Sequence, residues 1–266
     1  MFEGLVFGFL QGVTEWLPIS SEGLIVLFKT NFFQQVSLDE LLKLALFLHL
    51  GTTLSAVVYF RRDIVQLFKT LFHYKRASEG DRKLFNFLFI VTLVSGGLGL
   101  VMLRLVTEVS QSFEPTSRAL TLIIGVLLLI TAAILHYRSR ASGETNELRH
   151  TPSGTDSLIV GLAQGLAVLP GLSRSGLTTS GLLLRRFKDH EALRLSFLAS
   201  IPVVLAGNVV LNFKPGVVSL VMIVGLIASF IFGLASIHLL IKLAEKISLD
   251  KFVFIFGLLM ILAVLV

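Results

Sequence analysis

The chain has 266 residues, of which 54% are hydrophobic and only 15% are charged, and it contains no cysteine. An ordinary soluble domain is about 25% charged, so this composition leaves too few polar side chains to coat a soluble core and indicates a multi-pass membrane protein. It excludes disulfides and thiolate metal sites. The net charge of +6 is read first as a marker of membrane topology, so no nucleic-acid partner is expected.

Apolar segments long enough to cross a bilayer, which takes about 20 residues, occur along the whole chain. The expected spans are 42–60, 84–105, 119–137, 192–212, 218–241 and 251–266. Two more apolar stretches, 1–28 and 157–184, are interrupted by Gln, Gly, Pro and Ser, which favours re-entrant hairpins over lipid-exposed spans. Glu3 stands where a signal peptide would be basic, so no removable signal is expected.

The basic residues predict the orientation of the spans. The segments 61–83, 138–156, 185–194 and 242–251 together hold 17 of the 23 Lys and Arg, whereas five lie in segments on the opposite side. The positive-inside rule therefore places these four segments in the cytoplasm and both termini outside. The last basic residue, Arg174, lies inside the second hairpin. The chain is expected in the cell membrane.

An internal repeat connects the two hairpins. "GFLQG" at 8–12 recurs as "GLAQG" at 161–165, and "PISSEG" at 18–23 is matched by "PGLSRSG" at 170–176. Each copy contains one hairpin and three spans, and an odd number of spans inverts the second copy. The predicted fold is an all-α integral membrane protein with six transmembrane helices and two opposed re-entrant helical hairpins. Its parts are a first repeat (1–137), a cytoplasmic connecting loop (138–156) and a second repeat (157–266).

Opposed hairpins bring polar residues together inside the membrane. Gln11 and Glu15 are four residues apart and point the same way on a helix. We expect Glu15 and Arg174 to share one protein-lined cavity, because each lowers the cost of keeping the other charged. Hydroxyl-rich helix N-termini in both hairpins favour binding of an anion such as phosphate. The candidates for binding it are Gln11, Ser20, Ser173, Ser175, Gly176 and Thr178.

Structural alternatives apply to several of these residues. The hydroxyls at the hairpin tips could do no more than satisfy backbone groups, and Gln11 could be a helix-packing hydrogen bond. His49, inside the first span and followed by small polar residues, could reach the cavity or be a satisfied buried histidine.

The two motifs resemble the signatures of a known family. "QGVTEWLPISSEG" at 11–23 and "LPGLSRSGLTTS" at 169–180 are similar to the two signatures of the undecaprenyl-diphosphate phosphatase, or bacitracin-resistance, family. The resemblance implies a membrane enzyme that removes the terminal phosphate from a polyprenyl diphosphate lipid and so recycles the carrier for envelope glycan synthesis. It also implies help from Mg²⁺ or Ca²⁺ held by Glu15. The sequence leaves open whether the chain is a homodimer.

One departure from the family bears on mechanism. The first signature commonly ends in Gly-His, whereas this chain has Gly23-Leu24. His49 or Glu22 could substitute, the histidine could be dispensable, or the chain could bind without hydrolysing. The preferred mechanism has Arg174 neutralising the phosphate charge, Ser21 as nucleophile and Glu15 as its base. A water activated by Glu15 is the alternative. In either case the site would open to the external face. The rival function is a transporter or flippase for an anionic isoprenoid-phosphate lipid.

Overall fold

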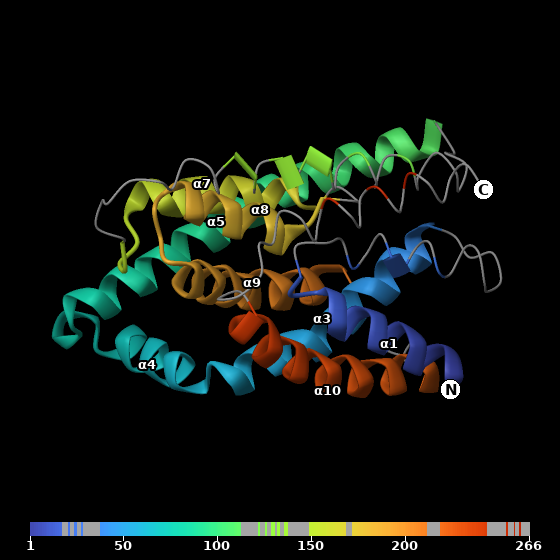
Figure 1. Ribbon diagram of the computed structural model, residues 1–266, viewed down its shortest axis with the longest axis horizontal. Helices are drawn as coiled ribbons and strands as arrows, with labels where there is room; N and C mark the ends of the chain where they lie inside the picture. The colour runs from blue at the N-terminus through green and yellow to red at the C-terminus, as the bar shows by residue number, and fades with distance from the viewer. Residues whose placement is uncertain are drawn as a thin grey trace.

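The computed structural model is built from helices throughout the part of the chain that it describes (Figure 1). That part comprises residues 1–17, 38–112, 149–168, 172–211 and 219–243, with residues 21, 24–25, 28, 122, 126, 129–130, 132–133, 136–137, 254, 258 and 261 between and beyond them. The helices are α1 (Phe2–Thr14), α3 (Leu38–Tyr59), α4 (Arg61–Phe72), α5 (Glu79–Ser112), α7 (Gly154–Leu166), α8 (Arg174–Leu184), α9 (Asp189–Leu211) and α10 (Leu220–Leu243), with a 3₁₀ turn, η1, at Tyr74–Arg76. No strand occurs among these residues, which confirms the all-α class.

Several helices are long and apolar enough to span a membrane. Within the described residues these are α5, α9 and α10, and α3 with α4 makes a fourth if that bent pair is one span. Helices α3, α5, α9 and α10 occupy four of the six ranges expected to cross. The expected spans at 119–137 and 251–266 lie largely outside the described residues. The chain is therefore a multi-pass membrane protein with at least three apolar helices of spanning length.

Helices α1, α7 and α8 are too short to cross. They have 13, 13 and 11 residues, and at 1.5 Å per residue each falls well short of a hydrocarbon core of about 30 Å. Local sequence explains where α7 and α8 begin. Ser153 and Asp156 form a capping box at the start of α7, and the Ser173 hydroxyl accepts from the Gly176 amide at the start of α8.

Glycines allow two close helix contacts, each of which joins the first half of the chain to the second. Helix α1 packs on α10, where Gly8 faces Gly225, and α7 packs on α5, where Gly161 faces Val94. A Cβ on Gly8 would lie 2.3 Å from the Gly225 carbonyl oxygen, and one on Gly161 would lie 2.8 Å from the Val94 Cβ. Small residues at such crossings are typical of membrane helices.

Gly8→Ala is expected to destabilise the protein by about 1 to 3 kcal/mol, because the added methyl must displace the α10 backbone. Thermal unfolding in detergent measures the effect. Gly96→Ala is the matched control, because a Cβ at Gly96 would meet nothing within 4 Å. Equal melting temperatures for the two variants would contradict the close α1–α10 crossing.

An aromatic cluster in the core positions the end of α1. Trp16 and Phe197 have ring centroids 4.7 Å apart, and Phe197 and Phe60 lie 6.5 Å apart. All three side chains are buried. The cluster ties the residues that follow α1 to α9 and to the end of α3, so the backbone at Glu15 is held on both sides.

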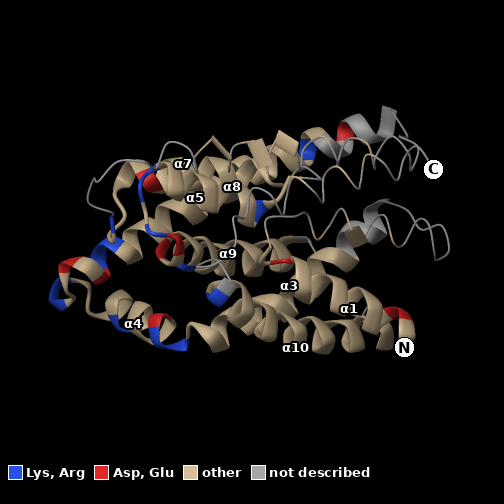
Figure 2. Ribbon diagram, in the orientation of Figure 1, with Lys and Arg blue, Asp and Glu red and all other residues tan. Residues whose placement is uncertain are grey.

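Among the described residues, many of the charged ones lie at one end of the molecule, around α4 and the starts of α5, α7 and α9 (Figure 2). The Asp156 side chain is fully buried there. Its carboxylate accepts from Arg149 Nη1 at 3.0 Å, from Arg149 Nη2 at 2.7 Å and from Arg185 Nε at 2.8 Å. Burial alone would raise the pKa of Asp156, but the hydrogen bonds from Arg149, Arg185 and Ser153 lower it from 3.8 to about 2. These ion pairs join the start of α7 to the end of α8.

Because its pKa is lower in the folded chain, Asp156 stabilises the protein fully only above pH 3.8, and that contribution disappears as the pH falls to about 2. Its size is about 2 kcal/mol. The expected result is a large stability difference between wild type and Asp156→Asn at pH 6 that shrinks between pH 4 and pH 2. A difference independent of pH, measured by thermal unfolding, would count against this assignment.

Candidate active site

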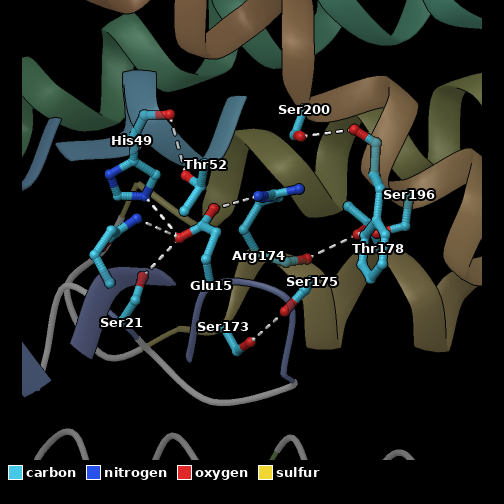
Figure 3. A network of polar contacts seen from close by, with 12 residues as sticks. Glu15, Ser21, His49, Thr52, Ser173, Arg174, Ser175, Thr178, Ser196 and Ser200 are labelled. Carbon is cyan, nitrogen blue, oxygen red and sulfur yellow. Dashed lines mark hydrogen bonds and ion pairs between the residues drawn. The ribbon is translucent and has the colours of Figure 1, made fainter. Parts of the chain in front are cut away.

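One buried carboxylate, that of Glu15, is the centre of the site (Figure 3). Its Oε2 atom accepts from Gln11 Nε2 at 2.8 Å and from Ser21 Oγ at 2.7 Å, and lies 3.0 Å from His49 Nε2. Its Oε1 atom accepts from Arg174 Nη2. Glu15 is 6% exposed. Four groups from α1, α3, α8 and residue 21 therefore meet on a single acid inside the protein.

Glu15 and Arg174 are in direct contact, as the sequence predicts, although 158 residues separate them in the chain. The predicted pairing of Gln11 with Glu15 across one helical turn is also observed. A second contact joins the same two segments, because Ser175 Oγ donates to the Leu17 carbonyl at 2.6 Å. The segment after α1 and the start of α8 therefore form one pocket.

Arg174 is the first residue of α8, and two partners fix its guanidinium. Nη2 donates to Glu15, and Cζ lies 5.7 Å from the centre of the Trp16 ring. Nη1 is buried and has no hydrogen-bond partner in the described part of the chain. A buried donor without a partner is costly, so this nitrogen is well suited to donate a hydrogen bond to an oxygen of a ligand.

His49 holds Glu15 from the side of α3. Its Nδ1 lies 2.6 Å from the Ala45 carbonyl oxygen, which can only accept, so Nδ1 carries a proton. The 3.0 Å contact between Nε2 and Glu15 then needs a second proton, carried either by the imidazole or by the carboxyl group. The two residues therefore share a proton inside the pocket.

The other predicted binding residues of the second hairpin are engaged within the protein. The Ser173 and Ser175 hydroxyls are 3.2 Å apart, and Thr178 Oγ1 lies 2.6 Å from Ser196 Oγ on α9. Gly176 is buried and donates its amide to Ser173. These contacts support the structural interpretation of the hydroxyls, while their role in substrate binding stays a prediction. Ser20 and Glu22 lie outside the described residues.

Comparison with known proteins decides the family. A family model described as bacitracin resistance protein BacA matches residues 4–263. The chain belongs to this family. It is 40% identical over 265 residues to a protein of Methanococcoides burtonii, covering 98% of this chain and 97% of the relative. It is 35% identical over 258 residues to one of Haloarcula marismortui (95% and 93% covered) and 34% identical over 255 residues to one of Desulforudis audaxviator (95% and 92% covered). All three are named undecaprenyl-diphosphatase.

The position at which the BacA family signature commonly has histidine contains a buried apolar residue. Leu24 is 8% exposed and belongs to the hydrophobic core cluster that includes Trp16. It therefore brings no polar group to the pocket. His49 is the imidazole that contacts Glu15.

Sequence reasoning missed three parts of this BacA family site. The first part is the Trp16 ring beside Arg174. Trp16 directly follows Glu15 in the first motif, and this position next to the predicted cavity could have suggested its role. The Ala45 carbonyl that orients His49 is one helical turn before it, but a backbone acceptor has no signature in sequence. Ser196, which meets Thr178, could have been found only by aligning α8 with α9.

Proposed function

We propose that this protein hydrolyses a polyprenyl diphosphate of the undecaprenyl type to the monophosphate and inorganic phosphate. The reaction would recycle the lipid carrier of envelope glycan synthesis. The names of the relatives support this substrate. The single observation that carries the proposal is the contact between Glu15 and Arg174, which puts an acid and a guanidinium in one buried pocket.

Arg174 and the start of α8 would bind the diphosphate. The guanidinium neutralises negative charge and offers Nη1, which has no partner among the described residues. The first amides of α8 and the positive end of its dipole add to this attraction. Both act more strongly on the transition state, in which charge accumulates on the departing oxygen.

Ser21 would be the nucleophile and Glu15 its base. The Ser21 hydroxyl already donates to Glu15 Oε2 at 2.7 Å, which is the geometry for proton removal. Attack forms a bond from Ser21 Oγ to the terminal phosphorus, breaks the anhydride bond and releases the prenyl monophosphate. Water then cleaves the phosphoserine to give phosphate and restore the hydroxyl. In the alternative, Glu15 takes a proton from water, which attacks phosphorus directly.

His49 would hold the shared proton next to Glu15 and so keep the carboxylate ionised and oriented as a base, and it would replace the histidine that the family signature places at position 24. Its Nδ1 contact with Ala45 fixes the ring, so Nε2 stays directed at the carboxylate.

His49→Ala is expected to lower kcat by about 10²-fold, at the lower end of what general acid–base groups contribute. Phosphate release measures the effect. His49→Gln, which restores a hydrogen-bond donor without an exchangeable ring proton, should recover melting temperature but not rate. Full activity in His49→Ala would exclude the hypothesis that His49 takes the role of the histidine that is absent at position 24.

A divalent cation fits this pocket only if one of the four groups around Glu15 moves. Gln11 is suited to do so, because its Oε1 has no partner in the described part of the chain and half a turn of its amide would present oxygen in place of nitrogen. Glu15 and Gln11, with oxygens of the diphosphate, would then hold Mg²⁺ or Ca²⁺. The cation would neutralise phosphate charge. No group of three His, Cys, Asp or Glu suited to a metal occurs among the described residues.

The proposed architecture is six spans and two opposed re-entrant hairpins in an inverted repeat, with the site open to the external face. Three observations support it. The helices of both hairpins are too short to span, α1 packs on α10 as α7 packs on α5, and the basic residues gather at one end (Figure 2). Under the positive-inside rule that end is cytoplasmic.

Release of phosphate from undecaprenyl diphosphate by the purified protein in detergent tests this function. The assay is run with chelator and again with added Mg²⁺ or Ca²⁺. The rival, a flippase for an anionic isoprenoid-phosphate lipid, is favoured by the reciprocal packing of the two halves, which is typical of transporters. A flippase releases no phosphate and needs a bilayer. No phosphate in detergent, with lipid movement in vesicles, would overturn the proposal.

A further inference from the structure

Helix α4 connects the end of α3, through η1, to the start of α5. It begins at Arg61, directly after α3, and is bent by 84° from that helix. After η1 the chain enters α5, which is long and apolar enough to span. A helix that is bent by 84° from the preceding apolar helix does not continue it, so α4 is a candidate for a position at the membrane surface.

One face of α4 is apolar and uncovered. Val65, Phe68 and Phe72 are spaced three and four residues apart and are 53%, 59% and 75% exposed. The opposite face is occupied, because Thr70 is 1% exposed and Leu67 packs against the core. Large apolar side chains in a row on a surface helix indicate contact with something other than water.

Polar contacts fix which way this face points. Asp63 of α4 pairs with Arg194 of α9, and Gln66 Nε2 donates to Asp81 of α5 at 2.9 Å. Both residues lie on the side of α4 turned toward the protein. The helix is therefore held in place by two neighbours, and its apolar face stays directed outward.

Basic side chains surround the apolar face. Those exposed on α4 and η1 are Arg61, Arg62, Lys69, Lys75 and Arg76. None of them has a carboxylate partner in the described ranges, because the nearby acids are engaged elsewhere. Asp63 pairs with Arg194, Asp81 accepts from Ser78, and Glu79 pairs with Lys83. The positive charge around α4 is therefore available to an anionic partner.

We propose that α4 and η1 form an interfacial element that binds anionic phospholipid. Val65, Phe68 and Phe72 enter the boundary between headgroups and acyl chains, and Arg62, Lys69, Lys75 and Arg76 contact lipid phosphates. An apolar stripe beside basic residues on a helix parallel to the membrane has the chemistry of an amphipathic surface helix. Each basic residue near an anionic leaflet adds to the attraction. The inference is independent of the hydrolytic function.

The absence of cysteine allows a direct test of insertion. A nitroxide is attached to Phe68→Cys in the full chain, reconstituted in vesicles of phosphatidylglycerol and phosphatidylcholine. Oxygen, which dissolves in lipid, should relax the label more than a water-soluble nickel complex does. Leu93→Cys on α5 is the lipid-facing control and Thr155→Cys is the aqueous control. A label at Phe68 that behaves like the one at Thr155 would overturn the proposal, as would dipolar broadening from a second copy.

The second measurement tests lipid charge. Binding of phosphatidylglycerol to the detergent-purified protein, followed by native mass spectrometry, should fall by about tenfold in Arg62→Gln/Lys69→Gln. Lys188→Gln/Lys242→Gln removes the same charge from exposed positions outside α4 and η1 and should bind as wild type does. Phosphatidylcholine and inorganic phosphate should not compete. Equal loss in both double variants, or competition by inorganic phosphate, would contradict a lipid site on α4.

Discussion

Replacing Arg174 by alanine is expected to lower kcat/KM for polyprenyl diphosphate by about 10³-fold or more, which is the range for an arginine that stabilises phosphoryl transfer. The structure gives the reason. Arg174 is the only Lys or Arg that contacts the Glu15 carboxylate within the described residues. Its Nη1 is a buried donor that has no hydrogen-bond partner among those residues. The assay is phosphate release under single-turnover conditions, which separates chemistry from product release.

Loss of folding must be distinguished from loss of chemistry, because Arg174→Ala leaves a buried carboxylate without its cation. Arg174→Lys keeps the charge but not the planar fork and should still lose about 10²-fold in rate at a melting temperature close to that of wild type. Arg186→Ala, at an exposed position outside the pocket, is the control and should be fully active. An Arg174→Lys enzyme as fast as wild type would show that the fork has no role.

Ser21→Ala has the second largest expected effect, a fall in kcat of about 10³-fold, because it removes the hydroxyl proposed as the nucleophile. The Ser21 hydroxyl is 2.7 Å from the carboxylate that would take its proton. Ser200→Ala is a matched control, because Ser200 is another buried serine, whose hydroxyl donates to the Phe197 carbonyl. Ser200→Ala should keep wild-type activity.

The two mechanisms differ in whether the enzyme carries phosphate. With Ser21 as nucleophile, rapid acid quenching of the wild type with substrate labelled in the terminal phosphate should leave label on a peptide containing Ser21. Ser21→Ala should show none. If the variant keeps more than about a tenth of the wild-type rate, direct attack by a water activated by Glu15 becomes the mechanism.

The contact between Glu15 and Arg174 could be predicted from sequence because the repeated motifs and the energetics of buried charge both indicated it. The recurring "QG" and Pro-Ser segments marked two hairpins, and the odd number of spans in each copy turned them toward each other. An unpaired charge inside a membrane is costly, so Glu15 and Arg174 were each expected to have a partner of opposite charge. The contact of Gln11 with Glu15 followed from helical spacing alone.

Helix α4 and the Asp156 cluster were not predicted, and the reasons are physical. The segment 61–83 was interpreted through its basic residues as a cytoplasmic segment, and the apolar positions Val65, Phe68 and Phe72 are too few to suggest a span. Their spacing places them on one helical face, but only the structure shows the 84° bend by which α4 departs from α3. Asp156 is one of several charges in a polar stretch, and nothing in that stretch reveals that Arg185 reaches it from the end of α8.

A double-mutant cycle on Glu15 and Arg174 tests most directly whether the two residues share one buried pocket. The four proteins are wild type, Glu15→Gln, Arg174→Gln and the double variant, and the quantity measured is the free energy of unfolding in detergent. Each single variant should lose about 3 kcal/mol, because it leaves one buried charge unpaired. The double variant should lose about 2 kcal/mol less than the sum of the two. Additive losses would contradict the shared pocket.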